Sequence, residues 1–150
     1  MSHYDRYIES TLAEGEEVQA VHTVLMVTRS TTATRLEPGG RMFTEARRRF
    51  ARRGGYEGEP GTVAHGIPFR QGGHLLVVTD RRVGLWRGPS QHRTGVLWSV
   101  PRDQLAGVER RPRLQFMSRF RLHFSDGSWA ALMTFRGRNV RRLAELLGTR

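Results

Sequence analysis

The second half of the chain, residues 72–134, is a nearly continuous series of short β-strand patterns, and this feature constrains the fold most. The phrase "LLVVTDRRVGLW" (75–86) holds two apolar runs on either side of a charged centre, which predicts two paired strands joined by a solvent-facing turn. Two more strands are predicted by "GVLWSV" and "LAGVERR", and a hairpin with Asp126-Gly127 in its turn by "RFRLHFSDGSWAALMTF". The sequence therefore predicts one antiparallel sheet.

The segments at the two ends of the chain predict helices. Residues 1–14 hold an apolar stripe at every fourth position, ended by Gly15, and a strand is expected over 17–28. His22 shares its alternation face with the apolar residues of that strand, which indicates a core histidine. At the other end, Asn139 is expected to cap a helix that Gly148 closes. The chain is thus expected to form a single domain over 1–150.

Residues 29–71 interrupt this pattern and carry nine Arg and four Glu, a net charge of +5. Within this insertion, residues 42–53 predict an amphipathic helix, because Met42, Phe43, Ala46 and Phe50 fall within one arc and arginines occupy most of the remainder. The following "GGYEGEPG" (54–61) predicts a flexible link.

The net charge of +11 is carried entirely by arginine, since all 25 basic residues are Arg. Guanidinium groups bind phosphate in a bidentate fork, so an anionic partner is one explanation. A genomic preference for GC-rich codons explains Arg over Lys, but it does not explain the excess of basic over acidic residues. Both explanations stay open on composition alone.

Several classes of function find no support in the residues. The chain has no cysteine, the six histidines show no metal-ligand spacing, and no phosphate-binding loop or nucleophile motif is present. Asp80, Asp103 and Asp126 are all typical of turns. We therefore expect no enzyme, no metal and no cofactor. No apolar run is long enough to span a bilayer and the start lacks a secretory signal, which favours a cytoplasmic protein.

The order of elements resembles a pleckstrin-homology (PH)-like barrel, with seven strands and one C-terminal helix. "GHLLVVTDRRVGLWR" is similar to the second and third strands of bacterial PH-like and GRAM-like domains, "VLWSVPRDQLAGVERRP" to the next two strands, and "FRLHFSDGSWAALMTF" to the closing hairpin. The resemblance covers about residues 15–28 and 72–148. It implies a mainly β fold with helices (α+β), an antiparallel barrel capped by the C-terminal helix, and a non-catalytic binding role. The second strand lacks the basic residues of the lipid-binding members, and the insertion falls in the first inter-strand loop.

Three functions are weighed on this basis. The first is a binding or scaffolding module for a protein partner or a second copy of the chain, using strand edges that accept an extra strand. The second is peripheral binding to anionic phospholipid at the inner membrane face through the insertion helix, where net charge alone contributes about 4 kcal/mol. The third is non-specific binding of nucleic acid.

Two sets of residues are candidates for anionic partners. The insertion set comprises Arg47, Arg48, Arg49, Arg52, Arg53, Phe43 and Phe50, and the second basic patch comprises Arg110, Arg111, Arg113, Arg119 and Arg121. Packing of the insertion helix on the protein itself and ordinary solvated strand positions are the structural alternatives. Stacking on nucleic acid would require exposed aromatics among the arginines, whereas Trp86, Trp98 and Trp129 all lie in apolar strands and are expected in the core.

Overall fold

The computed structural model describes residues 3–26, 56–68, 73–88, 95–114 and 117–150, and for residues 3, 4, 56, 113 and 114 it describes the backbone only. The residues of the predicted insertion helix lie outside these ranges. The elements in chain order are α1 (His3–Glu9), β1 (Val18–Met26), β2 (Tyr56–Glu57), β3 (Gly73–Thr79), β4 (Arg82–Arg87), β5 (Val96–Pro101), the 3₁₀ turn η1 (Arg102–Gln104), β6 (Leu105–Leu114), β7 (Met117–Phe124), β8 (Trp129–Thr134) and α4 (Gly137–Leu147).

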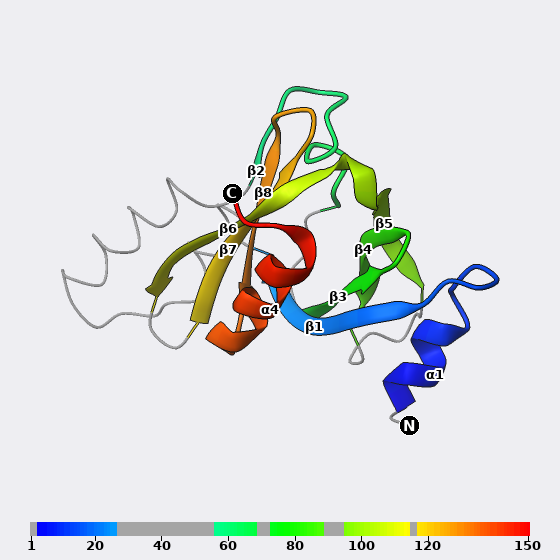
Figure 1. Cartoon of the computed structure of the whole chain (residues 1–150). Coiled ribbons are helices and arrows are strands. Elements are labelled where there is room, and N and C mark those ends of the chain that lie inside the picture. Colours follow the sequence, from blue (N-terminus) through cyan, green and yellow to red (C-terminus); the bar gives the residue numbers. More distant parts are fainter. Residues whose placement is uncertain (1–2, 27–55, 69–72, 89–94, 115–116) are drawn as a thin grey trace.

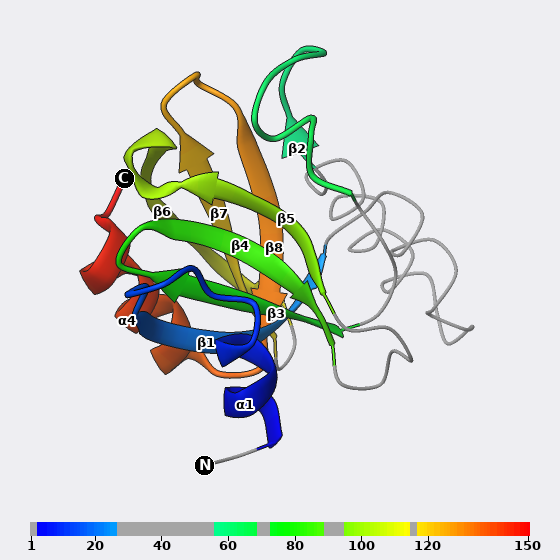
Figure 2. The same ribbon diagram turned by 90° about the vertical axis from the view of Figure 1, so that its right-hand side faces the viewer.

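The fold is mainly β, as the sequence predicts. Seven strands form one antiparallel sheet in the order β5-β4-β3-β1-β8-β7-β6, and the two-residue strand β2 pairs with β8 off this path. Figures 1 and 2 show that the sheet is strongly curled, with α4 packed against β6, β7 and β8. The predicted tight turn is confirmed between β7 and β8, where Gly127 has a φ of 85° that favours glycine.

The sheet is not closed into a barrel, so the expected barrel is confirmed only as one curled antiparallel sheet with a C-terminal helix packed on it. Among the described strands, β5 and β6 form the two ends of the sheet and do not pair with each other. They are consecutive in the chain, but η1 separates them. The Arg102 side chain holds η1 in place by donating to the carbonyl oxygens of Thr79 (3.2 Å) and Leu146 (2.6 Å). The Arg102 side chain therefore ties the connection between the two edge strands to β3 and to α4.

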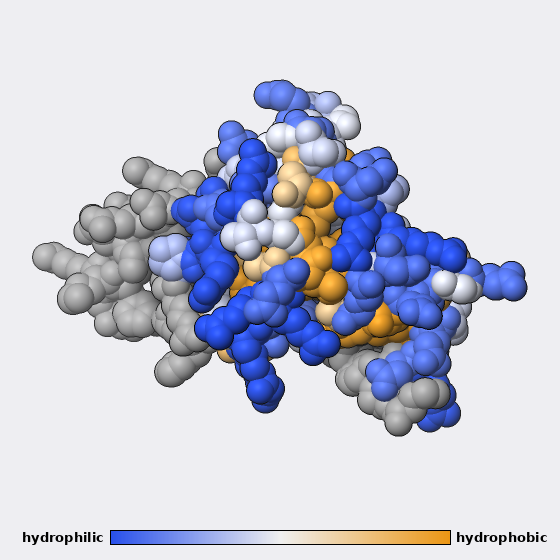
Figure 3. All heavy atoms as spheres, viewed as in Figure 1, coloured by the Kyte–Doolittle hydropathy of each residue, from blue (hydrophilic) through white to orange (hydrophobic). Residues whose placement is uncertain are grey.

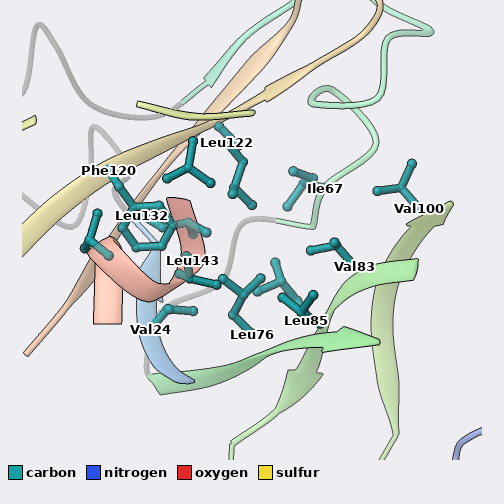
Figure 4. Close-up of a cluster of buried hydrophobic side chains, with 14 of the residues drawn as sticks. Val24, Ile67, Leu76, Val83, Leu85, Val100, Phe120, Leu122, Leu132 and Leu143 are labelled. Atoms are coloured by element: carbon teal, nitrogen blue, oxygen red, sulfur yellow. The ribbon is translucent and has the colours of Figure 1, made fainter. Parts of the chain in front are cut away.

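One hydrophobic core occupies the concave side of the sheet. Figure 4 shows Leu76 and Leu85 from one half of the sheet facing Leu122 and Leu132 from the other, with Leu143 of α4 between them. All of these side chains are at most 1% exposed. Strict alternation along β7 produces this arrangement, because its even-numbered apolar residues point inward and its basic residues point outward.

A second, smaller core lies on the opposite face of β3 and explains its uninterrupted apolar run. Leu75 and Val77 point away from the main core and pack with Trp86 against Ile8 of α1. Since β3 is covered on both faces, nearly every position along it is buried, and alternation is lost. The N-terminal helix is therefore an integral layer of the fold.

Residues 79–82, the charged centre of the phrase over 75–86, bind the segment between α1 and β1. The prediction of a solvent-facing turn was therefore wrong for Thr79 and Arg82, which are buried and partly buried. Glu16, which is 7% exposed, accepts hydrogen bonds from Arg82 Nε (2.7 Å) and Nη2 (3.0 Å) and from the Thr79 hydroxyl (2.7 Å). Asp80 accepts from the Glu17 amide (2.9 Å), and Arg81 donates to two carbonyls of the same segment. Each of the four central residues, 79–82, thus binds this segment.

This docking also explains why α1 ends at Glu9, earlier than predicted. Beyond the helix, the Thr11 carbonyl accepts from Arg82 Nη2 (3.0 Å) and the Thr11 hydroxyl accepts from Trp86 Nε1 (2.7 Å). Burial alone would raise the pKa of Glu16. The hydrogen bonds from Arg82, the Ala13 amide and Thr79, together with the charge of Arg82, outweigh this and lower the pKa to about 2.

The end of the predicted insertion is part of the core. The prediction of a flexible link over 54–61 was wrong where it meets the described residues, because Tyr56–Glu57 forms β2 and pairs with Trp129 and Ala130 of β8. The next residues, 58–68, carry Ala64 and Ile67 into the main core at 0% and 5% exposure. Figure 4 shows Ile67 pointing into the core near Leu122 and Val83. We call residues 58–68 the plug.

The plug is fastened to the turn between β7 and β8. Asp126 accepts from the Val63 amide (2.7 Å), and the Ser128 hydroxyl accepts from the Ala64 amide (3.1 Å). The hydrogen bonds that Asp126 accepts from Ser128 and Val63 lower its pKa. Asp126 is therefore a turn residue, as predicted, and it also closes this end of the core.

The C-terminal helix begins differently from the prediction. Its N-cap is Arg136, which makes no side-chain capping hydrogen bond, while Asn139 lies inside the helix and donates to the Thr134 hydroxyl (3.2 Å). Gly148 follows the last residue of the helix, as predicted. No helix in the described part of the chain is long and apolar enough to cross a membrane.

Replacing the buried carboxylate of Glu16 tests its importance for the fold. Glu16→Gln leaves the partly buried Arg82 without a counter-charge, so the free energy of unfolding at pH 7 should fall by about 2–3 kcal/mol. The folded-state pKa is lowered, so this contribution should be complete above pH 4.5 and lost as the pH falls toward about 2. Urea unfolding measures both, and Glu14→Gln, an exposed neighbour, is the matched control. Equal stability of the two variants would contradict this role.

Candidate functional site

The insertion set lies outside the described residues and stays a prediction. This applies to Phe43, Phe50 and to Arg47, Arg48, Arg49, Arg52 and Arg53. The part of the insertion that the structure describes, Tyr56–Glu57 with the plug, belongs to the fold.

The second basic patch is divided between the two faces of the sheet. Arg111, Arg119 and Arg121 project from the outer face of β6 and β7, where Arg111 lies opposite Arg119 and Glu109 opposite Arg121. Arg110 is opposite the core residue Phe120, so it belongs to the other face, at the exposed edge of β6. The backbone of Arg113 lies further along β6, and its side chain is outside the description.

A carboxylate at the centre of this outer face neutralises part of its charge. Glu109 contacts Arg111 Nη1 (2.6 Å), His123 Nε2 (2.7 Å) and, at 3.8 Å, Arg121 Nη1. Burial acts to raise the pKa of Glu109, but the bonds from His123 and Arg111 and the charges of Arg111 and Arg121 lower it overall. Arg111 and Arg121 of the patch are therefore paired within the protein, which weakens this part of the patch as a site for an external anion.

Trp129 also lies on this outer face, so its predicted place in the core was wrong. It is partly buried, the Arg121 guanidinium carbon lies 3.7 Å from its ring centroid, and its Nε1 donates to Glu57 (2.7 Å). The other two tryptophans are closer to expectation, since Trp86 is fully buried and Trp98 packs against the main core. Because Arg121 covers one face of the Trp129 ring, a nucleic-acid base cannot stack there.

The two ends of the sheet differ in what covers them. At β6, the C-terminal residues add a short parallel bridge between Val108 and Thr149, in which the Val108 amide donates to the Gly148 carbonyl (2.8 Å) and the Arg150 amide to the Val108 carbonyl (3.2 Å). Gly107 permits this close approach, with a φ of 146° and Gly148 O 3.3 Å from where its Cβ would be. Gly107 pairs with His123 beside a register irregularity in β6, and its missing side chain leaves room for the C-terminal residues.

At β5, no described residue pairs with the outer edge of the strand. Its start is fixed by Tyr7 of α1, whose hydroxyl donates to the Gly95 carbonyl (3.1 Å) and accepts from the Gly95 amide (2.6 Å). Val96 is 38% exposed, and Leu97 and Trp98 are partly buried. The described structure therefore presents a firmly positioned strand with apolar side chains and an unoccupied edge.

His22 is a core histidine, as predicted. It is 9% exposed, and its Nε2 has no hydrogen-bond partner in the described part of the chain. Burial, with a smaller contribution from the charge of Arg142, lowers its pKa. It therefore stays neutral in the fold and carries no sign of a ligand-binding role.

The arginines on the solvent side of α4 are a surface that motif-based reasoning missed. Their signal was present in the sequence, because Arg138, Arg141 and Arg142 fall within about 100° of a helical wheel, opposite the predicted apolar stripe.

Among the described residues, no group of acidic and histidine side chains could hold a metal ion.

Comparison with known proteins does not assign the chain to a family. No family model matches the sequence, and no curated protein matches it.

The buried His22 predicts a specific loss of stability in mild acid. Its folded-state pKa is lowered, so the unfolded chain binds more protons, and stability should fall as the pH drops below about 6.5. His22→Leu and His22→Gln should both reduce this loss between pH 7.5 and pH 5, while only His22→Leu should also be at least as stable at pH 7.5. Thermal unfolding across this range measures the effect, and an unchanged pH dependence in both variants would refute it.

Proposed function

We propose that this chain is a PH-like, non-catalytic binding module that contacts a protein partner through the open edge of β5. The observation that carries the proposal is the difference between the two ends of the sheet. The chain covers part of β6 with its own terminus, whereas β5 keeps an outer edge without a partner in the described structure. An extended segment of another protein can add to such an edge by main-chain hydrogen bonds.

The side chains of β5 support strand addition. An exposed strand edge can pair with another chain. Edge strands that stay unpaired are therefore usually short, charged or interrupted by proline. β5 has no charged residue, and its proline, Pro101, lies at its last position. A register shift places Val96 opposite Trp86 and Trp98 opposite Leu85, so β5 carries apolar side chains on both faces, beside which an incoming strand would bring its own apolar residues.

The strand order supports the PH-like part of the proposal. Seven antiparallel strands in one sheet, with β1 lying between β3 and β8 and the final helix packed on the sheet, agree with the order that the resemblance implies. The plug occupies the end of the core beside the turn between β7 and β8, so a partner is expected at the edge rather than inside the sheet.

A charged substitution at the edge tests the proposal. Peptides selected from a random displayed library should include extended binders whose affinity falls about tenfold or more in Val96→Lys, because the added charge opposes strand addition. Val18→Lys is the matched control, since Val18 is equally exposed at 39% but lies on an interior strand. Binding measured by calorimetry and mapped to β5 amides by NMR supports the proposal. Selected peptides that bind both variants equally, or that map elsewhere, would overturn it. Sedimentation would show whether a second copy occupies the edge.

A further inference from the structure

The outward face of α4 carries several exposed arginines that have no acidic partner among the described residues. Arg138, Arg141 and Arg142 are exposed along the helix, and Arg136 precedes it. None of these four guanidinium groups makes a hydrogen bond or ion pair with any described residue. Figure 3 shows hydrophilic residues over most of the face on which α4 lies. We call these four residues, with Phe135, the α4 surface.

Phe135 adds an exposed apolar side chain in the short connection that leads from β8 into α4. It is 62% exposed, more than any other large hydrophobic residue among those described. It follows β8 directly, so the backbone on either side of it belongs to the sheet and to the packed helix. Aromatic side chains are enriched among the residues that contribute most to binding at protein interfaces, and this one is accessible to a partner.

The fold does not require these residues. The helix is held by Val140, Leu143 and Ala144, which are buried on its opposite face. The first turn contains no acidic residue, although acidic residues there would stabilise the helix and arginines do not. The charge arrangement therefore lowers helix stability, which is typical of residues kept for binding.

We propose that the α4 surface docks an acidic, amphipathic helical segment of a partner protein. Arginine and aromatic residues are the types that dominate the energetics of protein interfaces. Apolar side chains of the segment would cover Phe135, and its carboxylates would face Arg138, Arg141 and Arg142. This surface is separate from the β5 edge, and the proposal holds whether or not β5 adds a strand.

Glu145 distinguishes a protein segment from a uniformly anionic surface. It is exposed on the same side of α4, one turn beyond Arg141 and Arg142, and makes no ion pair with a described residue. A membrane or a nucleic-acid backbone places negative charge against it, which is repulsive. A protein segment can place a basic residue there, so the pattern of three positive positions followed by one negative position specifies a complementary sequence. One phenylalanine with this net charge also gives a membrane only a weak hold.

The probe for the test is a synthetic helical peptide of about 18 residues, or five helical turns. Its leucines form one stripe, its glutamates flank the stripe over the first three turns, and one lysine follows at the position facing Glu145. A shuffled peptide of the same composition and net charge is the control for non-specific attraction. Titrations of the full chain, followed by NMR and fluorescence anisotropy, should show the matched peptide binding about tenfold more tightly than the shuffled one.

Two variants locate the binding. Arg138→Glu/Arg142→Glu should lose about tenfold or more in affinity for the matched peptide, yet unfold at nearly the same temperature, because neither guanidinium group pairs with a described residue and the glutamate at 138 in the first turn offsets the repulsion between the two glutamates. It should instead bind a peptide in which lysine replaces each glutamate. Arg6→Glu/Arg87→Glu changes the net charge equally on α1 and β4 and should bind the matched peptide as the original chain does. Phe135→Ser should weaken binding without changing the fold.

Four results would overturn the proposal. The first two are that the matched peptide does not bind, or that the shuffled peptide binds equally well. The third is that both double variants lose the same affinity for the matched peptide. The fourth is that phosphatidylserine vesicles or a single-stranded oligonucleotide bind more tightly than the matched peptide and require the same residues. Because the β5 test uses Val96→Lys, which leaves the α4 surface intact, failure of one proposal is distinguishable from failure of the other.

Discussion

The unclosed sheet is the constraint on which the rest of this structure depends, because each of its two edges presents main-chain donors and acceptors that need partners. The chain meets this need at β6 with its own last residues and leaves the described edge of β5 without one. Two separate segments pair with the same edge of β8: Met26 of β1 lies opposite Leu132, and Tyr56 of β2 lies opposite Ala130. The plug that follows β2 then fills the core where the curled sheet would otherwise be open.

A second constraint is the polar cluster around Glu16, which turns a loose N-terminal segment into a layer of the domain. Its carboxylate joins the segment after α1 to the turn between β3 and β4, and α1 then covers the outer side of β3. The buried Glu16 carboxylate thereby holds α1 over the outer face of β3, so that the apolar side chains on both faces of β3 are shielded from water. This arrangement also leaves Tyr7 of α1 in place to position the start of β5 at Gly95.

Periodicity predicted what depends on local pattern, namely the seven strands, the terminal helix, the turn at Gly127 and the burial of His22. It could not predict interactions between distant segments. The TDRR phrase looks like an exposed turn until Glu16, 66 positions from Arg82, is brought to it. Trp129 has the alternation of a core residue, and only the pairing of β7 with β8 shows that its side shares the outer face with Arg121. The arginines of α4 were visible on a helical wheel, but their lack of partners is a property of the fold.

The measurement that tests this account most directly is amide hydrogen exchange along β5 and β6, resolved residue by residue by NMR in the full chain. An open β5 edge predicts alternating protection along Val96–Pro101, with slow exchange only for amides that face β4, while the Val108 amide of β6 stays protected by Gly148. Addition of a β5-binding peptide should then protect the remaining amides of β5. Uniform protection of β5 in the isolated chain would contradict the account, because it would show that this edge is already occupied.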